Sequence, residues 1–457
     1  MSVNRRKFIE TSGKALAGTF LLPHAALSAI KEPNNGMQTD ALKSVKAIAP
    51  KRILLRSAWA VSNIGDIGHT PGTLHILEEH LPDAEVTLWP VIINAEVESM
   101  LLRRFPKLKI IKGNLTSGEG APLNPDILQA FEQTDFFLYN SGMHFNYGLF
   151  NYEWNGLMGL MSQFFICQKL GKPYGMFGHS FDLWAQPSPY VFASVLNKAA
   201  FIYCRDGESL KYIKENGIKA PVMEFGPDGC FGIDTLDEQK GSAYLKTNGL
   251  KENDFMALII RSYTPKPEAT ANNKDKLNPY QPTPEQQELD RARFAKINAL
   301  VTAWVRQTKK KVLLAPEAFK EITAAKALVY DQQPDDVKPY LVHRHEFWNA
   351  DEALSVYKRA RVVMGMEPHS LIMALAVGVP VIHTCPFSFG KKGWMFRDIG
   401  LPEWLFDIDK DDTATMQQAL FHIHNNHTAA RNKAAKAMQF VKQRQKDAMQ
   451  VLKLSIK

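Results

Sequence analysis

The sequence predicts an α/β protein of two domains, each a parallel sheet with helices on both faces. Two observations support this prediction. Short β-branched or apolar runs alternate with stretches of helical length along most of the chain, and the alternation restarts near residue 255. The length of 457 residues, with 45% hydrophobic and 22% charged residues, exceeds what one hydrophobic core usually serves. We therefore expect two doubly wound halves that face each other across a cleft.

The N-terminal segment has the features of an export signal. Arg5 and Arg6 precede a mildly apolar stretch, residues 15–22, and small residues follow up to Ala29. We interpret residues 1–30 as a twin-arginine signal peptide, which implies a periplasmic or otherwise extracytoplasmic protein. The apolar core is too short to span a bilayer, which takes roughly 20 residues, so no stable transmembrane segment is predicted. The alternative is an amphipathic helix at the start of a cytoplasmic protein.

The remaining chain divides by its pattern into five segments. Strand and helix signals fill two of them, polar or mixed-charge residues without a sustained period fill two, and helical residues with a basic outer face fill the last. In chain order the segments are a linker at 31–50, the first domain at 51–229, a linker at 230–253, the second domain at 254–409 and C-terminal helices at 410–457.

In the first domain, a glycine-bearing loop is expected to follow the opening strand, residues 52–59, and to end at a helix that starts near Pro71. Asn63 and Asp66 would supply hydrogen-bond acceptors there for sugar hydroxyls, and Gly65 would allow a positive φ. Asn63 could instead only shape an Asx turn. Further strands are expected at 85–91, 108–112, 135–140, 173–177, 200–204 and 222–225.

Arg205 follows the strand predicted at residues 200–204 and begins the sequence Arg-Asp-Gly-Glu-Ser. An arginine at a strand end offers a planar fork of donors for a carboxylate or phosphate. Asp206 or Ser209 can cap the helix that follows. The alternative is an internal ion pair of Arg205 with Asp206 or Glu208.

The central unit of the second domain is a strand, turn, helix and strand over Val362–Thr384. Its turn carries Glu367 and His369, the candidate catalytic residues, with His369 as a general acid or base beside an anion site. Ser370 or His369 can cap the helix, whose first N–H groups attract anions. Arg261, Glu317 and His345 also follow predicted strands of this domain. Parallel strands end at one edge of a sheet, so these side chains are expected to converge on His369. An ordinary polar histidine at a helix start is the competing interpretation.

After the last of these strands, the segment from His383 to Asp407 holds Lys391 and Lys392 among glycines and aromatic residues. Lysines can bind phosphate and aromatic faces can stack on sugars. A loop that only covers the sheet edge is an equal interpretation.

Composition excludes several classes of function. The excess of 55 Lys and Arg over 47 Asp and Glu is modest, and no run interleaves aromatics with a dense basic stripe, so nucleic-acid binding is not predicted. The four cysteines are scattered singly, without the spacing of a metal or redox motif. No metal site and no cofactor are predicted.

Several motifs resemble the polysaccharide pyruvyl transferase family. They are His-Ser-Leu-Ile-Met-Ala-Leu-Ala-Val-Gly-Val-Pro from His369, Asn-Ile-Gly-Asp from Asn63, the Arg-Asp-x-x-Ser element from Arg205 and the Pro-Asp-x-x-Phe element from Pro227. The resemblance implies two Rossmann-like domains in a GT-B-like arrangement, with C-terminal helices packing back on the N-terminal domain. It also implies transfer of a pyruvyl ketal from phosphoenolpyruvate or a related donor to hydroxyls of a glycan acceptor. His369 would be the proton donor, with Arg205 and Lys391 or Lys392 seating the anionic donor.

The chain departs from that family at one position. Glu367 stands where the family has the arginine of Arg-x-His, so a carboxylate replaces a donor fork. Export adds a second conflict, because phosphoenolpyruvate is a cytoplasmic metabolite. Two alternatives therefore stay open: a catalytically altered member that binds carbohydrate, or a glycosyltransferase-like enzyme. The glycosyltransferase pattern is the poorer match, since Leu375 occupies the position of its second glutamate.

Overall fold

A computed structural model describes residues 50–118, 120–148, 153–262 and 282–456. The expected export signal and the greater part of the linker that follows it lie outside these residues. So does most of the stretch 264–284, which is polar and rich in Pro, Lys and Asn and which the sequence predicts to be an exposed insertion. Among the helices of the described ranges, none is long and apolar enough to cross a membrane.

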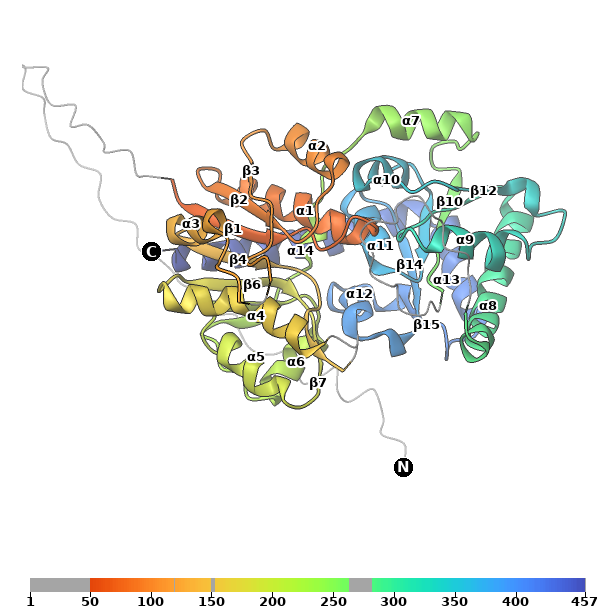
Figure 1. Ribbon diagram of the computed structural model, residues 1–457. Helices are drawn as coiled ribbons and strands as arrows, with labels where there is room; N and C mark the ends of the chain where they lie inside the picture. The colour runs from red at the N-terminus through yellow and green to blue at the C-terminus, as the bar shows by residue number, and fades with distance from the viewer. Residues whose placement is uncertain (1–49, 119, 149–152, 263–281, 457) are drawn as a thin grey trace, which may run out of the picture. The chain divides into compact units, whose positions relative to one another are not determined.

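Two parallel sheets carry the fold, and Figure 1 shows them with helices on both faces. The first sheet has seven strands in the order β3-β2-β1-β4-β6-β8-β9, and the second has six in the order β12-β11-β10-β13-β14-β15. Every strand pair in both sheets is parallel. In each sheet the strand order reverses beside the first strand, which is the doubly wound pattern that places ligands at the carboxyl ends of the strands.

The strands agree closely with the sequence-based expectation, because β-branched and aromatic runs bounded by turn residues mark them clearly. The first sheet consists of β1 (Arg52–Ser57), β2 (Glu85–Pro90), β3 (Lys109–Ile110), β4 (Phe136–Asn140), β6 (Tyr174–His179), β8 (Phe201–Cys204) and β9 (Met223–Phe225). The second consists of β10 (Phe255–Ile259), β11 (Lys311–Leu314), β12 (Leu341–His343), β13 (Val362–Gly365), β14 (Val381–Cys385) and β15 (Leu405–Asp407).

Helices connect the strands. Those of the first half are α1 (Ile64–His80), α2 (Ala95–Arg104), α3 (Pro125–Gln133), α4 (Trp154–Lys169), α5 (Ser188–Leu196) and α6 (Gly207–Glu215). Those of the second half are α8 (Pro284–Thr308), α9 (Glu321–Ala325), α10 (Ala350–Tyr357), α11 (Pro368–Ala376) and α12 (Met395–Asp398), with short 3-10 or π segments between them. The chain ends with α13 (Thr413–Asn425) and α14 (His427–Ser455).

The first sheet separates two hydrophobic cores. Alternate residues of β1 face opposite sides, so Ile53 and Leu55 pack with the helix α1 while Leu54 packs with the aromatic core under α3 and α4. Buried apolar area of this kind contributes about 25 cal/mol per Å². Both faces of the strand are therefore fixed, which places its carboxyl end firmly at the site.

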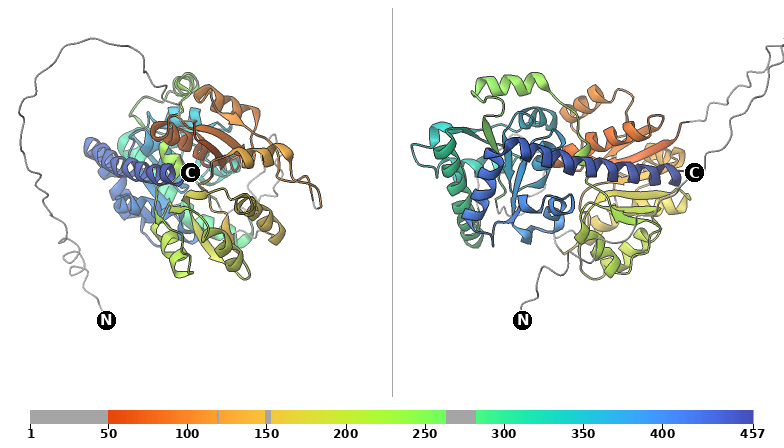
Figure 2. Two further views of the ribbon diagram at one scale, coloured as in Figure 1. Left: turned by 90° about the vertical axis from the view of Figure 1, so that its left-hand side faces the viewer. Right: turned by 180° about the vertical axis from the view of Figure 1, so that it is seen from behind.

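The C-terminal helix α14 returns to the first half, as the GT-B-like expectation required. Figure 2 shows it running along both sheets when the protein is seen from behind. Arg444 on this helix donates to the Phe225 carbonyl at 2.8 Å and pairs with Glu224 at 2.5 Å, and Phe440 stacks on Phe225. The end of the chain therefore braces the last strand of the first sheet.

Some elements differ from the sequence-based expectation. The largest difference is at α1, which begins at Ile64 rather than near Pro71, so most of the expected glycine loop is helix. Pro71 lies inside this helix, where it removes one helical hydrogen bond. The mixed-charge stretch 230–253 contains a helix, α7 (Glu238–Thr247), and β5 (Phe145–Tyr147) pairs with β7 (Phe181–Trp184) in a separate two-stranded sheet. The short strand β15 and the helix α5 were also not expected.

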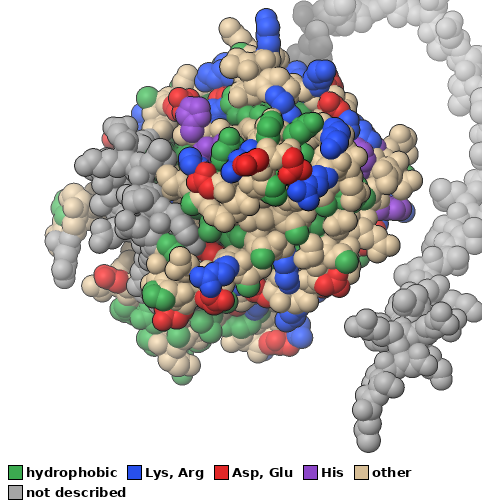
Figure 3. Space-filling model, turned by 90° about the vertical axis from the view of Figure 1, so that its right-hand side faces the viewer, with side chains coloured by type: hydrophobic (Ala, Val, Ile, Leu, Met, Phe, Trp, Pro, Cys, Tyr) green, Lys and Arg blue, Asp and Glu red, His purple; other side chains and the backbone are tan. Residues whose placement is uncertain are grey.

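On the face drawn in Figure 3, side chains of both charge signs are interspersed.

Candidate active site

The helix α1 starts at the carboxyl edge of the first sheet and is held there by contacts with the second half. Asn63 is its N-cap, and its side chain accepts from the Gly65 and Asp66 amides at 2.7 and 3.3 Å. Removing such a cap typically costs about 1 kcal/mol. Asn63 therefore shapes the backbone, the alternative that the sequence left open, and Asp66 lies in the first helical turn.

Gly65 has a role that the sequence did not reveal. It is helical, so the expected positive φ is wrong, but a Cβ on Gly65 would lie 2.4 Å from Nδ1 of His369. Such a separation is far below van der Waals contact, so a larger residue would displace the imidazole. The glycine is needed for the close approach of α1 to the ring of His369.

Glu317 connects the starts of two helices from the two halves. Its backbone carbonyl accepts from the Ile64 amide at 2.8 Å at the start of α1. Its carboxylate accepts from the Ser370 amide at 2.7 Å in the first turn of α11 and lies 3.2 Å from Nδ1 of His369. The N-terminus of α11 is therefore satisfied by Glu317. The expected caps, His369 and Ser370, are wrong, since the N-cap position is Glu367 and Ser370 Oγ accepts from Tyr357.

Arg205 reaches the same point from the first half. Its Nη1 donates to Oδ2 of Asp228 at 2.6 Å and lies 3.4 Å from Nε2 of His369, and its Nε donates to Ser180 at 2.8 Å. Asp206 instead caps α6 through the Ser209 amide at 2.6 Å. The alternative of an internal Arg205 pair with Asp206 or Glu208 is therefore wrong, because Asp228 is the partner of Arg205.

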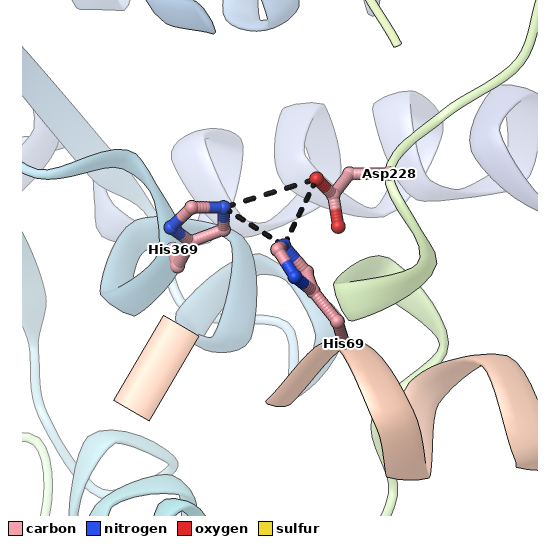
Figure 4. A group of neighbouring side chains, drawn as sticks. All are labelled: His69, Asp228 and His369. Atoms are coloured by element: carbon pink, nitrogen blue, oxygen red, sulfur yellow. Dashed lines mark hydrogen bonds and ion pairs between the residues drawn. The ribbon is translucent and has the colours of Figure 1, made fainter. Parts of the chain in front are cut away.

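A second histidine completes the cluster. Nε2 of His69 on α1 lies 3.0 Å from Nε2 of His369 and 3.3 Å from Oδ2 of Asp228, as Figure 4 shows. The two rings meet at 81°, edge to face. We name the group of His69, Arg205, Asp228, Glu317 and His369 the interdomain cluster, since its members come from both sheets. Each of these five residues is at most 6% exposed.

The cluster decides where the protons are. Burial alone would lower the pKa of His369, but hydrogen bonding and charge from Asp228 and Glu317 raise it to about 9. Burial lowers the pKa of His69, and the carboxylate of Asp228 only partly opposes this. Burial also opposes ionisation of Asp228, yet the neighbouring imidazoles and Arg205 hold its pKa well below the usual value. At neutral pH, His369 is thus an imidazolium beside a neutral His69.

The spacing of His69, Asp228 and His369 would also suit a metal ion, because their ligand atoms lie within 4.8 Å of one another. Charge favours a proton instead. With His369 protonated, the imidazolium and the Arg205 guanidinium cancel the two carboxylates. A divalent cation in place of the proton would leave an uncompensated positive charge in a buried site, beside the Arg205 guanidinium that already pairs with Asp228 at 2.6 Å. We interpret the cluster as an acid–base site.

A second group of charged residues surrounds Glu367, which stands two residues before His369 in the sequence. Glu367 accepts from Arg261 at 2.7 Å and from Lys392 at 2.9 Å, and we name these three residues the compensated triad. Burial would raise the pKa of Glu367, but the two cations lower it to about 2. Arg261 and Lys392 thus occupy the region where the family arginine is missing, and Glu367 offsets one of their two charges.

The other predicted site residues are placed differently. Lys391 lies over the ring of Tyr212 and pairs with Asp182 at 3.3 Å, so it contacts the first half. His345 is exposed and belongs to neither group, whereas the neighbouring Arg344 is buried. Two further histidines that end or follow strands of the first sheet, His144 and His179, have structural roles: the ring of His144 packs against Trp59 at a tilt of 47°, and His179 accepts from the Phe145 amide of β5 at 3.4 Å.

Sequence reasoning did not select His69 or Asp228. His69 stands in a helix in which its neighbours three and four positions away are glycines, Asp66 and Thr73, and Asp228 belongs to the Pro-Asp element at the end of the first half. No local pattern therefore marked His69, and only the Pro-Asp element marked Asp228.

The architecture and the edge site define the class of protein. The chain has the GT-B fold, with two Rossmann-like sheets and a bracing C-terminal helix. Solved structures of HepE from Anabaena share it: the complex with UDP-glucose has 13% identity and a TM-score of 0.52, covering 88% of this chain and 98% of that one. The complex with UDP and glucose has 14% identity and a TM-score of 0.50, covering 86% and 95%. Another similar structure is E. coli ADP-heptose lps heptosyltransferase II, at 10% identity and a TM-score of 0.45, covering 83% of this chain and 99% of that one.

The family follows from the sequence itself. The model of the polysaccharide pyruvyl transferase family matches residues 63–384, which is more than half of the chain. The chain belongs to this family. No curated protein matches it.

Proposed function

We propose that the protein transfers a pyruvyl group from phosphoenolpyruvate, or a related enolpyruvyl donor, to two hydroxyls of a glycan as a ketal. The observation that carries the proposal is the interdomain cluster, in which His369 is held as an imidazolium between Glu317 and Asp228, 3.4 Å from Arg205. Protonating the enol carbon needs a positioned acid, and the donor's carboxylate and phosphate need cations. Membership of the polysaccharide pyruvyl transferase family supports this reaction.

Each residue would have a defined part. His369 would give its Nε2 proton to the methylene carbon of the donor. Arg205, Arg261 and Lys392 would attract its anionic groups, with Arg205 acting from the first half and the other two from the second. Because the cluster is buried where the two halves meet, the donor would enter when the halves separate. Two backbone hydrogen bonds of 2.8 Å, Ile64 to Glu317 and Phe319 to Ser62, would break in that movement.

One observation favours a second candidate function. Glu367 replaces the family arginine and binds both Arg261 and Lys392, so the cationic seat is weaker than in the family pattern. A carboxylate at this position can accept hydrogen bonds from sugar hydroxyls. The second candidate is therefore a catalytically altered member that binds carbohydrate without transferring a pyruvyl group.

The experiment that separates these functions combines a thermal-shift screen with a turnover assay on the full chain. The ligands are phosphoenolpyruvate, nucleotide sugars and glycan fragments. Stabilisation by phosphoenolpyruvate together with phosphate release and a ketal methyl signal by NMR supports the transferase. Stabilisation by glycan fragments alone, without turnover, supports the carbohydrate-binding protein. Stabilisation by nucleotide sugars with transfer of the sugar would replace both with a glycosyltransferase-like activity.

We propose as well that the chain is exported, on the basis of Arg5 and Arg6 and the short apolar stretch that follows. Replacing both arginines by lysine should trap the precursor inside the cell. Unchanged export by the same route would remove the argument. An exported enzyme would have to receive its enolpyruvyl donor outside the cytoplasm, so the compartment and the donor need to be determined together.

A further inference from the structure

We infer that His69 is the catalytic base that takes the proton from the attacking hydroxyl of the acceptor, and that it returns this proton to His369. This inference rests on the proposed transfer reaction. It adds a second catalytic group, contributed by the opposite half of the protein from His369.

The contact between the two rings requires a single proton between them. Nε2 of His69 and Nε2 of His369 are 3.0 Å apart, which is hydrogen-bond distance. Two protons in that space would clash, and two bare nitrogens would repel each other. One ring must therefore donate while the other accepts.

The surroundings decide which ring holds the proton. Nδ1 of His369 faces a carboxylate oxygen of Glu317 at 3.2 Å, which stabilises an imidazolium. Nδ1 of His69 is buried and has no hydrogen-bond partner within the described part of the chain. The two histidines also have pKa values shifted in opposite directions, which is the pattern of an acid and a base in one site. With His369 as the imidazolium, its Nε2–H points at Nε2 of His69, which then accepts with a lone pair. Oδ2 of Asp228 lies 3.3 Å from this Nε2 of His69 and would stabilise the positive charge that the ring gains when it takes up a proton.

In this inference the glycan hydroxyl and the enolpyruvyl donor bind between the two rings. His69 belongs to α1 of the first half and His369 to α11 of the second, so separating the halves opens a gap directly between the two Nε2 atoms. Figure 4 shows the two Nε2 atoms facing each other, with Asp228 beside them. A hydroxyl that enters the gap would lie next to the lone pair of His69 and near the N–H of His369.

Protons balance in each of the two steps of the reaction. In the first addition, His369 gives its proton to the methylene carbon, the acceptor oxygen bonds to the central carbon of the donor, and the hydroxyl proton goes to His69. The proton then passes from His69 to His369 across the direct contact, which restores the starting state. In the second step another hydroxyl gives its proton to His69, its oxygen displaces phosphate, and the departing phosphate takes a proton from His369. The same transfer resets the pair, and no oxidant or reductant is needed.

The test replaces His69 by Gln in the full chain and measures ketal formation from phosphoenolpyruvate with a panel of methyl glycosides. We expect kcat to fall by about 10²–10⁴-fold, the usual contribution of a general base, while KM for phosphoenolpyruvate changes by less than about threefold. The matched control is His80→Gln, which lies about three turns further along the same helix, at 3.6 residues per turn, and outside the cluster. It should keep the parent rate. Imidazole added to His69→Ala should restore part of the lost turnover, which a purely structural role would not allow.

The outcomes are distinct. Turnover of His69→Gln within threefold of the parent overturns the base while leaving the proposed transfer intact. A parent that forms no ketal with any glycoside overturns the proposed function and this inference together. If His69→Gln loses its cooperative thermal transition, nitrogen-15 NMR of the parent decides: a neutral His69 ring with its proton on Nδ1 at pH 7 supports the inference, and a doubly protonated His69 overturns it.

Discussion

The interdomain cluster and the compensated triad meet at the start of α11, where one member of each lies two residues from the other, yet the two groups are built differently. His369 belongs to the first and Glu367 to the second. The triad is local, since Arg261, Glu367 and Lys392 all belong to the second half and both cations bind the one carboxylate. The cluster draws His69, Arg205 and Asp228 from the first half toward His369 and Glu317 in the second.

This difference separates a binding role from a chemical one. In the triad, the charge of Glu367 is fixed by two cations, and its low pKa excludes proton exchange near neutrality. In the cluster, the Nε2 atoms of two rings from different halves lie 3.0 Å apart, so a proton shared by the two rings would depend on the closeness of the halves. Chemistry is therefore expected from the cluster, and modulation of anion binding from the triad.

The largest expected effect is from His369→Gln. Turnover should fall by about 10³-fold, because the amide keeps a hydrogen-bonding group but cannot deliver a proton. Binding of phosphoenolpyruvate, measured by calorimetry, should stay within a few-fold of the parent. His345→Gln is the control, since His345 is an exposed histidine of the same half. A His369→Gln enzyme with more than a tenth of the parent rate would remove the acid from the account.

Arg205→Lys should come next. Lysine keeps the charge but loses the fork that binds Asp228 and Ser180 together, so KM for phosphoenolpyruvate should rise by about 10–100-fold, or 1.4–2.7 kcal/mol. Arg205→Ala would leave Asp228 buried without its partner, which typically costs 3–5 kcal/mol in the free energy of unfolding. Arg261→Lys is the comparison from the triad, and its smaller effect would be measured in the same assay. Equal effects at the two arginines would contradict the distinction drawn here.

Gly65→Ala tests the close approach of α1 to His369. The new methyl would meet the imidazole at 2.4 Å, so overpacking should destabilise the protein by about 1–3 kcal/mol and lower kcat as well. Gly156→Ala is the matched control, because Gly156 is a helical glycine of α4 with open space around it. It should be neutral or gain up to about 1 kcal/mol. Chemical denaturation gives both values, and equal responses of the two glycines would show that the contact with His369 is relaxed in solution.

The pH dependence of stability tests the protonation of His369. Its folded pKa of about 9 lies above its unfolded value of about 6.5. The resulting stabilisation is fully present below pH 6.5 and is lost as pH rises through 9, by roughly 1–3 kcal/mol. Urea unfolding at pH 6.5 and pH 9 measures it. The loss should be much smaller in His369→Gln, and an identical loss in that variant would assign the effect to other groups.

Glu367→Gln should have the smallest effect. It removes the negative charge from the triad and frees Arg261 and Lys392 to bind an anion, so affinity for phosphoenolpyruvate should rise by up to about tenfold, or 1.4 kcal/mol. Turnover should change little, because Glu367 holds no transferable proton near neutrality. A loss of turnover as large as that of His369→Gln would place Glu367 in the chemistry.

Much of the fold was predictable, because local patterns determine it. The strands β1 and β10 and the restart at residue 255 follow from apolar runs bounded by turn residues. The start of α1 was not predictable, since Asn63 caps a helix whose first turn contains glycine and precedes a proline. The glycine pattern suggested a loop, and packing against the second half made it a helix.

The site was predictable in part for the same reason. His369, Arg205 and Glu317 follow strands of parallel sheets, so their convergence could be expected. His345 also follows a strand but turns outward, and His69 lies within a helix, where no edge rule applies. The partner of Arg205 depends on Asp228 from a later segment, and a contact between two sheets has no signature in local sequence.

The most direct test of the central claim is the titration of His369 by NMR in the full chain, with ring signals assigned from His369→Gln. The account predicts that the ring stays protonated through neutral pH and titrates near pH 9, because Glu317 and Asp228 hold the charge. His69→Gln should change that titration, whereas His80→Gln should not. A His369 ring that titrates at or below its ordinary value of about 6.5 would contradict the account, because no acid would then be ready at the site.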